Sequence, residues 1–369
     1  MTDAITPATW VVWGGFALAF VFGAIANKTN FCTMGAISDV VNMEHWGRIR
    51  MWLLAIAVAM IGTNLLHYFE QIDLSKSLYH RPTLPWLSLI LGGAVFGVGM
   101  TIASGCANKN LVRLGGGSLR SLVVLVFGAI SGYITLKGLF GQWRSSYLDP
   151  VSIDLVAMGF ANQSLPHLLA RTGGMSDKTA LLVAGGVVGL GLLVFVFKDK
   201  RFRSNPSHVI GSTVLGLLIV MAWYLTGHIG FGENPETLET VYFATNTRTL
   251  ESFSFVAPTS FSLELLMLWT DKSLHVTFGI ATVAGVVLGS FAYAISTHQF
   301  RWEGFASVDD LRAHLLGALL MGFGGVTAIG CTIGQGLSGV STLSLGSCIA
   351  LAGIVGGAVA TMKWQVWRA

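Results

Sequence analysis

The sequence predicts an all-α polytopic membrane protein with about nine transmembrane helices, short broken or re-entrant helices, and an inverted internal repeat. Composition is the first observation: 53% of the 369 residues are hydrophobic and 11% are charged, whereas a soluble domain carries about 25% charged residues. The second is a series of uncharged stretches long enough for an α-helix to cross a bilayer. Helices rather than a barrel are expected, because each segment must satisfy its own backbone groups in lipid.

Nine hydrophobic segments are predicted to cross the membrane, and one more to form a short or interfacial helix. In chain order, the nine are Trp10–Ala26, Met51–Leu66, Leu84–Ser104, Leu119–Lys137, Lys178–Phe197, His208–His228, Leu274–Ile295, Leu315–Gly330 and Leu343–Met362. The additional helix is expected within Val151–Leu169.

Loop charges predict the orientation of the bundle. The segment Lys198–Ser204 is strongly basic, whereas residues 229–271 contain several glutamates and one basic residue, Arg248. Because Lys and Arg are enriched in cytoplasmic loops, the first loop is expected inside and the second outside. The prediction is a multi-pass protein of a bacterial inner membrane, with a periplasmic N-terminus and a cytoplasmic C-terminus. No basic cluster suggests a nucleic-acid partner.

A glycine-cysteine motif occurs twice, as IASGCANKN at residues 102–110 and AIGCTIGQG at residues 328–336. Small residues of the first copy recur 225 positions later, pairing Gly92, Gly97, Gly99, Ala103 and Gly105 with Gly317, Gly322, Gly324, Ala328 and Gly330. The preceding spans are predicted to enter from opposite sides. This predicts an inverted repeat, with halves near 10–140 and 208–362 inside one transmembrane domain, 1–369; such repeats are characteristic of transporters.

Each motif is followed by a polar, glycine-rich stretch, which predicts a helix broken inside the membrane and buried in protein or lining a cavity. Free N–H groups at such breaks would face an anion, and the positive end of a helix dipole adds to the attraction. Close helix crossing also explains glycines, but it does not explain the polar residues beside them. The predicted supporting residues are Gly105, Asn108, Lys109, Gly330, Thr332, Gly334 and Gln335.

Three of the four cysteines are the candidate substrate-binding residues. Cys106 and Cys331 occupy equivalent places in the two copies, so both thiols are expected near the midplane, facing one cavity. Cys32 follows the first span in another polar break and is expected to line one mouth. Cys348 lies within a span and is assigned to packing, since free cysteine behaves as a small hydrophobe.

Thiols at such a site suit a soft anion or a soft metal. A neutral thiol can hydrogen-bond anionic sulfur without charge repulsion, whereas a thiolate attracts metal. Metal transport would be expected to bring His, Met or carboxylate partners, and only Met34 and Met100 are near. An anion is favoured, and no metal site or cofactor is predicted. The motifs contain no Ser-His-Asp spacing, P-loop or paired carboxylates, so no enzyme is predicted; a membrane thiol oxidoreductase is the less favoured alternative.

These motifs resemble those of the YeeE/YedE family of sulfur-compound transporters, through NFCTMGAISD (30–39), residues 97–118 and residues 322–339. The resemblance implies thiosulfate uptake into the cytoplasm through an hourglass-shaped bundle. It also implies that Cys32, Cys106 and Cys331 pass the anion inward by S–H···S hydrogen bonds. Small cytosolic sulfurtransferases of the TusA type are the implied partners. Some members are associated with selenium or other sulfur compounds, so such a substrate is the alternative.

Overall fold

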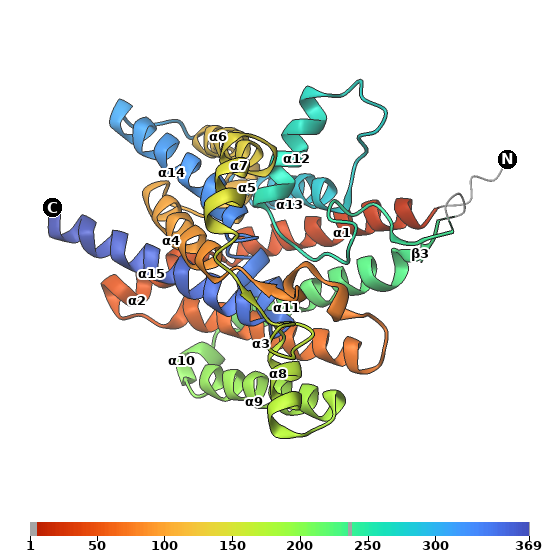
Figure 1. Cartoon of the computed structure of the whole chain (residues 1–369). Coiled ribbons are helices and arrows are strands. Elements are labelled where there is room, and N and C mark those ends of the chain that lie inside the picture. The colour runs from red at the N-terminus through yellow and green to blue at the C-terminus, as the bar shows by residue number, and fades with distance from the viewer. Residues whose placement is uncertain (1–5, 235–237, 369) are drawn as a thin grey trace.

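The computed structural model describes residues 6–234 and 238–368 as an α-helical bundle (Figure 1). The long helices are α1 Pro7–Lys28, α3 Gly47–Tyr68, α4 Trp86–Ile102, α6 Leu119–Lys137, α9 Asp177–Phe197, α11 Pro206–Tyr224, α13 Phe278–Ser296, α14 Val308–Thr327 and α15 Leu345–Arg368. The shorter helices are α2 Thr33–Met43, α5 Ala107–Gly115, α7 Leu139–Trp143, α8 Leu165–Gly173, α10 Lys200–Arg203 and α12 Val256–Met267.

Irregular helices and two small hairpins connect these elements. The 3₁₀ turns are η1 Leu74–Lys76 and η2 Leu78–His80, and the π-helices are η3 Arg144–Leu148, η4 Leu225–Ile229 and η5 Gly334–Gly339. Strand β1 Thr83–Leu84 pairs antiparallel with β2 Ile153–Asp154, and β3 Phe231–Glu233 pairs with β4 Thr240–Tyr242.

The predicted all-α polytopic fold is confirmed. Eight helical stretches among the described residues are long and apolar enough to cross a membrane. The span predicted at Leu315–Gly330 is helix α14, which is 20 residues long. Its first two turns carry Asp309, Asp310 and Arg312, which lower its mean hydropathy, so it is not one of the eight. At about 1.5 Å per residue it is nevertheless as long as the hydrocarbon core is thick.

The additional helix predicted within Val151–Leu169 is wrong in position. Residues up to 163 form turns and strand β2, and helix α8 begins at Leu165. The start is fixed by Ser164, whose hydroxyl accepts the His167 N–H, and by Pro166 in the first turn. Both residues are favoured at helix N-termini.

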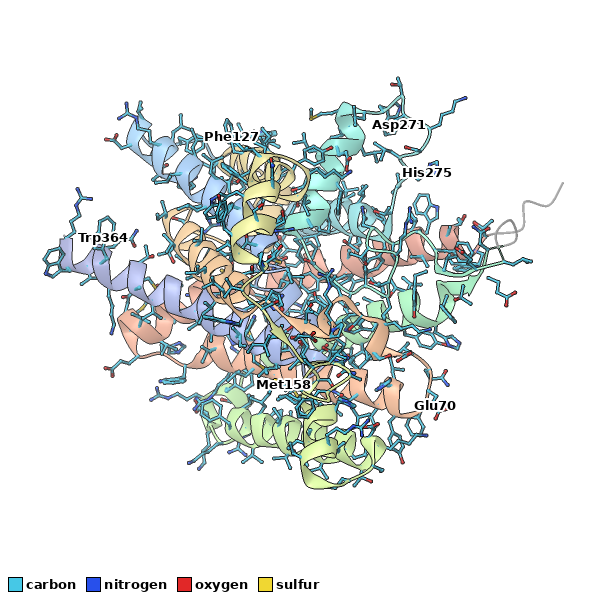
Figure 2. The ribbon with its side chains drawn as sticks, viewed as in Figure 1. Glu70, Phe127, Met158, Asp271, His275 and Trp364 are labelled. Carbon is cyan, nitrogen blue, oxygen red and sulfur yellow. The ribbon has the colours of Figure 1, made fainter. Side chains whose placement is uncertain are left out.

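Helix α1 begins on one side of the molecule and helix α15 ends on the opposite side (Figure 1). Glu70 and His275 lie on the side where α1 begins, and Trp364 lies near the other end (Figure 2). We call the side where α1 begins the N-face and the side where α15 ends the C-face. Several exposed apolar side chains, such as Phe127 on α6, lie on the flank between them, as expected for a surface that contacts lipid.

The helix pairing is duplicated along the chain. Helix α1 packs on α13 and α11 packs on α3; α4 packs on α15 and α14 packs on α6; α2 contacts α15 and α12 contacts α6. These pairs correspond when helices α1, α2, α3, α4 and α6 are matched in order with α11, α12, α13, α14 and α15. The π-helix η5 then takes the place of α5. Helices α7–α10 are an insertion between the two sets, and α9 packs on α3. The duplicated pairing supports the predicted halves, 10–140 and 208–362, although this division stays a prediction.

Helices α4 and α14 cross at the centre, and their contacts repeat at the 225-residue offset. A Cβ added to Gly92 would lie 2.6 Å from the Ala328 nitrogen, and one added to the equivalent Gly317 would lie 2.7 Å from the Ala103 nitrogen. Each contact thus pairs a residue of one copy with the equivalent of its partner in the other copy. Such a pattern requires that a local two-fold axis relate the two antiparallel helices. The absence of side chains at these glycines lets the two backbones touch.

Replacing Gly97 with alanine should destabilise the fold, because the new Cβ would lie 2.2 Å from the Ile354 carbonyl oxygen of α15. The two helices would have to separate, and overpacking of this kind costs about 1–3 kcal/mol. The measurement is the apparent melting temperature in detergent. Gly191→Ala on α9 is the matched control, since a Cβ there meets no atom within 4 Å and should be neutral or slightly stabilising. Equal melting temperatures would contradict the close approach.

Candidate functional site

Three helices end shortly before a buried cysteine. Helices α1, α4 and α14 all end with a left-handed residue two positions before the cysteine: Asn30 (φ 51°), Ser104 (φ 54°) and Ile329 (φ 58°). In each case the N–H of the next residue donates to a carbonyl five positions back, at 3.0, 2.8 and 2.8 Å respectively. This is a Schellman-type helix end, and it turns the chain so that the cysteine leaves the helix axis.

The left-handed position is unusual at Ile329. A β-branched residue with positive φ is strained, and the following Gly330 also has a positive φ of 155°. A Cβ on Gly330 would lie 3.2 Å from Gln335 Cγ. The predicted supporting residue Gly330 is therefore required by both backbone conformation and space.

The three cysteines at these stops are buried. Cys106 and Cys331 are fully inaccessible and Cys32 is 8% exposed, whereas Cys348 is exposed on α15. Helix α2 begins after Cys32 and helix α5 after Cys106, so both cysteines take the N-cap position that Ser, Thr, Asp and Asn usually occupy. The predicted site cysteines thus share a local structure, and Cys348 does not share it.

Each site thiol faces the backbone N–H three residues later. The Gly35 N–H donates to Cys32 Sγ at 3.3 Å, and the Gly334 N–H donates to Cys331 Sγ at 3.4 Å. The Lys109 N–H lies near the Cys106 thiol, but it does not make the capping hydrogen bond seen at the other two cysteines. The sulfur atoms therefore lie at the start of helical segments, where helix dipoles and the first N–H groups favour negative charge.

The thiols form a chain of neighbours rather than separate sites. Cys106 lies near enough to both Cys32 and Cys331 for a charge on one thiol to affect the other. At one end, Tyr79 interacts with Cys331; at the other, Lys109 interacts with Cys32 and Cys106. Cys106 therefore occupies the middle of the series.

Side-chain amides hold the two repeat-related breaks in shape. Asn110 Nδ2 donates to the Gly105 and Cys106 carbonyls at 3.0 and 3.1 Å, and Gln335 Nε2 donates to the Ala328 carbonyl at 2.6 Å. Asn110 and Gln335 are equivalent at the 225-residue offset. They bind carbonyl groups at the two breaks, where the helical hydrogen-bond pattern is interrupted inside the protein.

Unpartnered polar atoms gather beside the cysteines. Among the described residues, the buried oxygens Thr33 Oγ1, Asn108 Oδ1, Thr332 Oγ1 and Gln335 Oε1 lack a protein hydrogen bond of good geometry. Thr332 Oγ1 faces the Cys106 thiol. A buried polar group without a partner costs about 1–3 kcal/mol, so a polar ligand that supplied partners to these oxygens would stabilise this region.

The second break contains one residue more than the first. Twelve positions separate Cys106 from Ser118, but thirteen separate Cys331 from Ser344. The serines are structurally equivalent, because each precedes a helix whose first N–H donates to a distant loop carbonyl, Leu119 to Glu303 and Leu345 to Gln163. The extra residue is accommodated in π-helix η5, and such inserted residues are frequent at functional sites.

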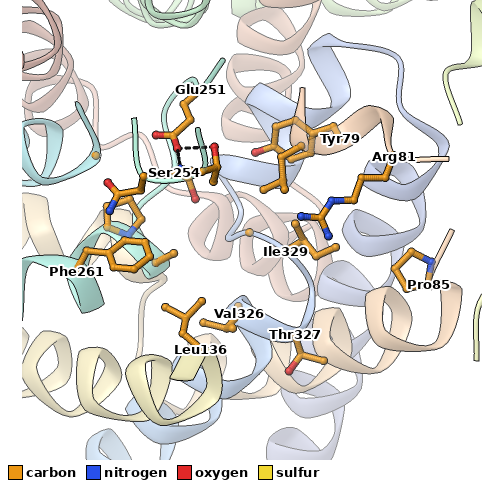
Figure 3. Close-up of a pocket in the computed structure, with 18 of the residues that line it drawn as sticks. Tyr79, Arg81, Pro85, Leu136, Glu251, Ser254, Phe261, Val326, Thr327 and Ile329 are labelled. Atoms are coloured by element: carbon orange, nitrogen blue, oxygen red, sulfur yellow. Dashed lines mark hydrogen bonds between the residues drawn. The ribbon is translucent and has the colours of Figure 1, made fainter. Parts of the chain in front are cut away.

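A cavity of about 540 Å³ is lined by the connections that follow α3 and α11 on the N-face, and it reaches Ile329 and Gly330, directly before Cys331. We call it the N-face cavity. It is lined by the β1 connection, the ends of α6 and α14, and the segment that leads into α12 (Figure 3). Tyr79, Arg81 and Arg144 line it, and the sequence did not single them out. All three lie in short connecting segments with no recognisable motif, and only the tertiary fold brings them to the cavity.

Basic side chains surround Cys32 on the side toward the C-face. Lys109 Nζ donates to Asn30 Oδ1 at 3.2 Å, and Arg113 Nη1 donates to the Ser104 carbonyl at 2.8 Å. Both cations therefore bind the left-handed residues of the helix stops. Arg48 also interacts with Cys32, while paired with Asp39 at 2.5 Å. Within the described residues, no group of three His, Cys, Asp or Glu side chains converges to hold a metal ion.

Interrupted helices around buried thiols, in a polytopic helical bundle with duplicated packing, define a membrane protein of the transporter type. A sequence model for sulphur transport matches residues 28–360. The chain belongs to this sulphur transport family, which confirms the resemblance to YeeE/YedE proteins.

Two relatives are similar over almost their full length. The thiosulfate transporter TsuA of Escherichia coli K12 is 24% identical, over 97% of this chain and 95% of its own length. The thiosulfate transporter TsuA of Spirochaeta thermophila is 26% identical, over 97% of this chain and all of its own length.

Acidification should destabilise the connection beside the second break. Burial lowers the pKa of His80 to about 4, and its Nε2 lies 3.0 Å from the Thr342 carbonyl. The unfolded pKa is about 6.5, so the neutral ring contributes its full stability above pH 6.5. That stability is lost as the pH falls toward 4, by an amount on the order of 3 kcal/mol.

The measurement is the free energy of unfolding in detergent at pH 7 and pH 5. His80→Gln should lose less stability on acidification than the wild type, because it cannot take up the proton. His275→Gln, at an exposed loop position, is the control and should behave as wild type. An undiminished acid sensitivity in His80→Gln would show that this ring is not responsible.

Proposed function

We propose that the protein takes up thiosulfate from the N-face, on the periplasmic side, to the C-face, on the cytoplasmic side. The observation that carries the proposal is the chain of buried thiols, Cys331 to Cys106 to Cys32, between the N-face cavity and the basic residues near Cys32. The names of the two relatives supply the substrate.

Charge supports this orientation. Arg48 and Arg50 lie in the first turn of α3, and the Lys198–Arg203 segment joins α9 to α11, both on the C-face, whereas the connection between α11 and α13 is predominantly acidic. Cytoplasmic loops of inner-membrane proteins are enriched in Lys and Arg. The N-terminus is then periplasmic and the C-terminus cytoplasmic.

The thiols suit the proposed substrate for a chemical reason. A neutral S–H group donates a weak hydrogen bond to the terminal sulfur of thiosulfate without adding negative charge. The break N–H groups, with Thr332 and the Asn108 amide, replace part of the water that the anion loses on entering. In this relay Cys331 receives the anion, Cys106 holds it at the constriction and Cys32 releases it beside Lys109 and Arg113.

A membrane thiol oxidoreductase is the alternative class. It would need a disulfide between two of the site thiols during turnover, whereas the relay needs all three reduced. Mass spectrometry after mild oxidation and alkylation distinguishes them. Another sulfur or selenium compound is the alternative substrate, and a TusA-type sulfurtransferase is the proposed cytosolic acceptor of the sulfur.

Cys106→Ala and Cys331→Ala should each abolish thiosulfate-dependent growth of a strain that lacks other uptake systems. Each substitution removes the only thiol at its step, and the anion would face a buried apolar group instead. Cys348→Ala is the matched control and should grow as wild type, because its thiol is exposed on α15. Normal growth of either site variant would refute the relay.

Uptake of labelled thiosulfate into proteoliposomes tests the activity itself. Sulfate, selenite and tellurite serve as competitors, and the assay is run with and without a pH gradient. Uptake that needs the protein and the three cysteines is expected. Transport of selenite in place of thiosulfate would assign the alternative substrate.

A further inference from the structure

The N-face cavity contains two arginines with different partners. Arg144 forms an ion pair with Asp149, Nε to Oδ2 at 3.2 Å, and Asp149 also accepts the Ser88 hydroxyl at 2.7 Å. Arg81 also lines the cavity, and among the described residues no carboxylate lies within ion-pair distance of it. Its guanidinium reaches into the cavity toward Ile329 (Figure 3).

The other acidic group of the cavity, Glu251, is occupied elsewhere. Its Oε1 accepts the Thr247 N–H and the Thr247 hydroxyl, both at 2.7 Å (dashed in Figure 3). Asp149 compensates Arg144, so the positive charge of Arg81 is the one without a paired carboxylate in this part of the structure.

Arg81 is exposed as a whole residue, but its guanidinium lies against the cavity and loses part of its hydration there. Burial lowers the pKa of Arg81, and the nearby positive charge of Arg144 lowers it further, with Asp149 opposing. An arginine nevertheless stays protonated at physiological pH. The surrounding Leu136, Phe261 and Val326 are apolar, which strengthens any electrostatic interaction inside the cavity. An anion bound here would offset the lost hydration.

Thr327 is a further polar residue of the cavity lining. Thr327 Oγ1 is buried and has no hydrogen-bond partner among the described residues, and Thr327 lines the cavity at the end of α14. A guanidinium offers two parallel N–H donors that match two oxygens of an oxoanion. The Thr327 hydroxyl is inaccessible in this structure, and it would add a third donor after a rotation of its side chain.

We infer that Arg81, with Arg144 and Thr327, forms a binding site for small doubly charged oxoanions at the N-face end of the path. This Arg81 site rests on the proposed function, since it is where the anion waits before it reaches Cys331. It selects by charge and oxygen geometry, and the cysteines then select for the terminal sulfur. Sulfate, which has the charge but no terminal sulfur, therefore binds the Arg81 site and is not carried onward.

The test compares the full-length wild type with Arg81→Gln and Arg81→Lys in proteoliposomes. Sulfate should inhibit thiosulfate uptake by the wild type competitively. Arg81→Gln should raise the KM for thiosulfate and the inhibition constant of sulfate by about tenfold or more, the effect of losing a charge-assisted hydrogen bond. The maximal rate should change far less. Arg81→Lys keeps the charge and should fall between. Arg171→Gln, on exposed helix α8, is the control.

Calorimetric titration of sulfate into the purified protein separates this inference from the proposed function. If the wild type does not carry thiosulfate but binds sulfate in an Arg81-dependent way, the Arg81 site stands and the transport proposal fails. If thiosulfate is carried and Arg81→Gln, monodisperse on size exclusion, keeps the wild-type KM and sulfate inhibition, the Arg81 site is overturned.

Discussion

The structure depends on one constraint: a helix that stops inside a bilayer must satisfy its last carbonyls and the next helix's first N–H groups with protein, since lipid offers no partners. Helices α1, α4 and α14 meet it with the same turn, a left-handed residue followed two positions later by a cysteine. The carbonyls are paired by the turn and by the amides of Asn110 and Gln335. N–H groups at the start of the next helical segment donate to the thiol sulfurs of Cys32 and Cys331. The turn that satisfies the backbone groups at the helix end thus also places a cysteine thiol beside the positive end of a helix dipole, which attracts anions.

Close helix packing makes these stops possible. The glycines of α4 and α14 bring the two backbones into contact, and the breaks then converge from opposite sides on the space around Cys106. The two copies are not identical. The second has one extra residue, absorbed by π-helix η5, and the residue before α12 is Phe255 where the residue before α2 is Cys32. Duplication explains the paired central thiols, and divergence gives the two ends different chemistry: arginines and a cavity on the N-face, a third thiol and lysine on the C-face.

Much of this could be predicted from sequence, because the signals were local or periodic. Long apolar runs gave the spans, and the 225-residue offset identified Cys106 and Cys331 as equivalent. The missed features depend on tertiary structure. Arg81 stands in a short loop with nothing distinctive around it, and its role in the cavity arises only when α6, α12 and α14 close around it. The shared turn before each cysteine was missed because Asn30, Ser104 and Ile329 have no residue type in common; their common feature is a backbone angle. Helix α8 was misplaced because hydrophobicity marked the segment, whereas Ser164 and Pro166 fix its start.

The central claim is that three thiols border one passage, with Cys106 in the middle. The most direct measurement is a cryo-EM structure of the protein in lipid nanodiscs with thiosulfate bound. The account predicts density for the anion between the two central breaks, with its terminal sulfur against the Cys106 thiol and its oxygens toward the break N–H groups. An anion bound away from all three sulfurs, or thiols separated by closed helix seams, would contradict it.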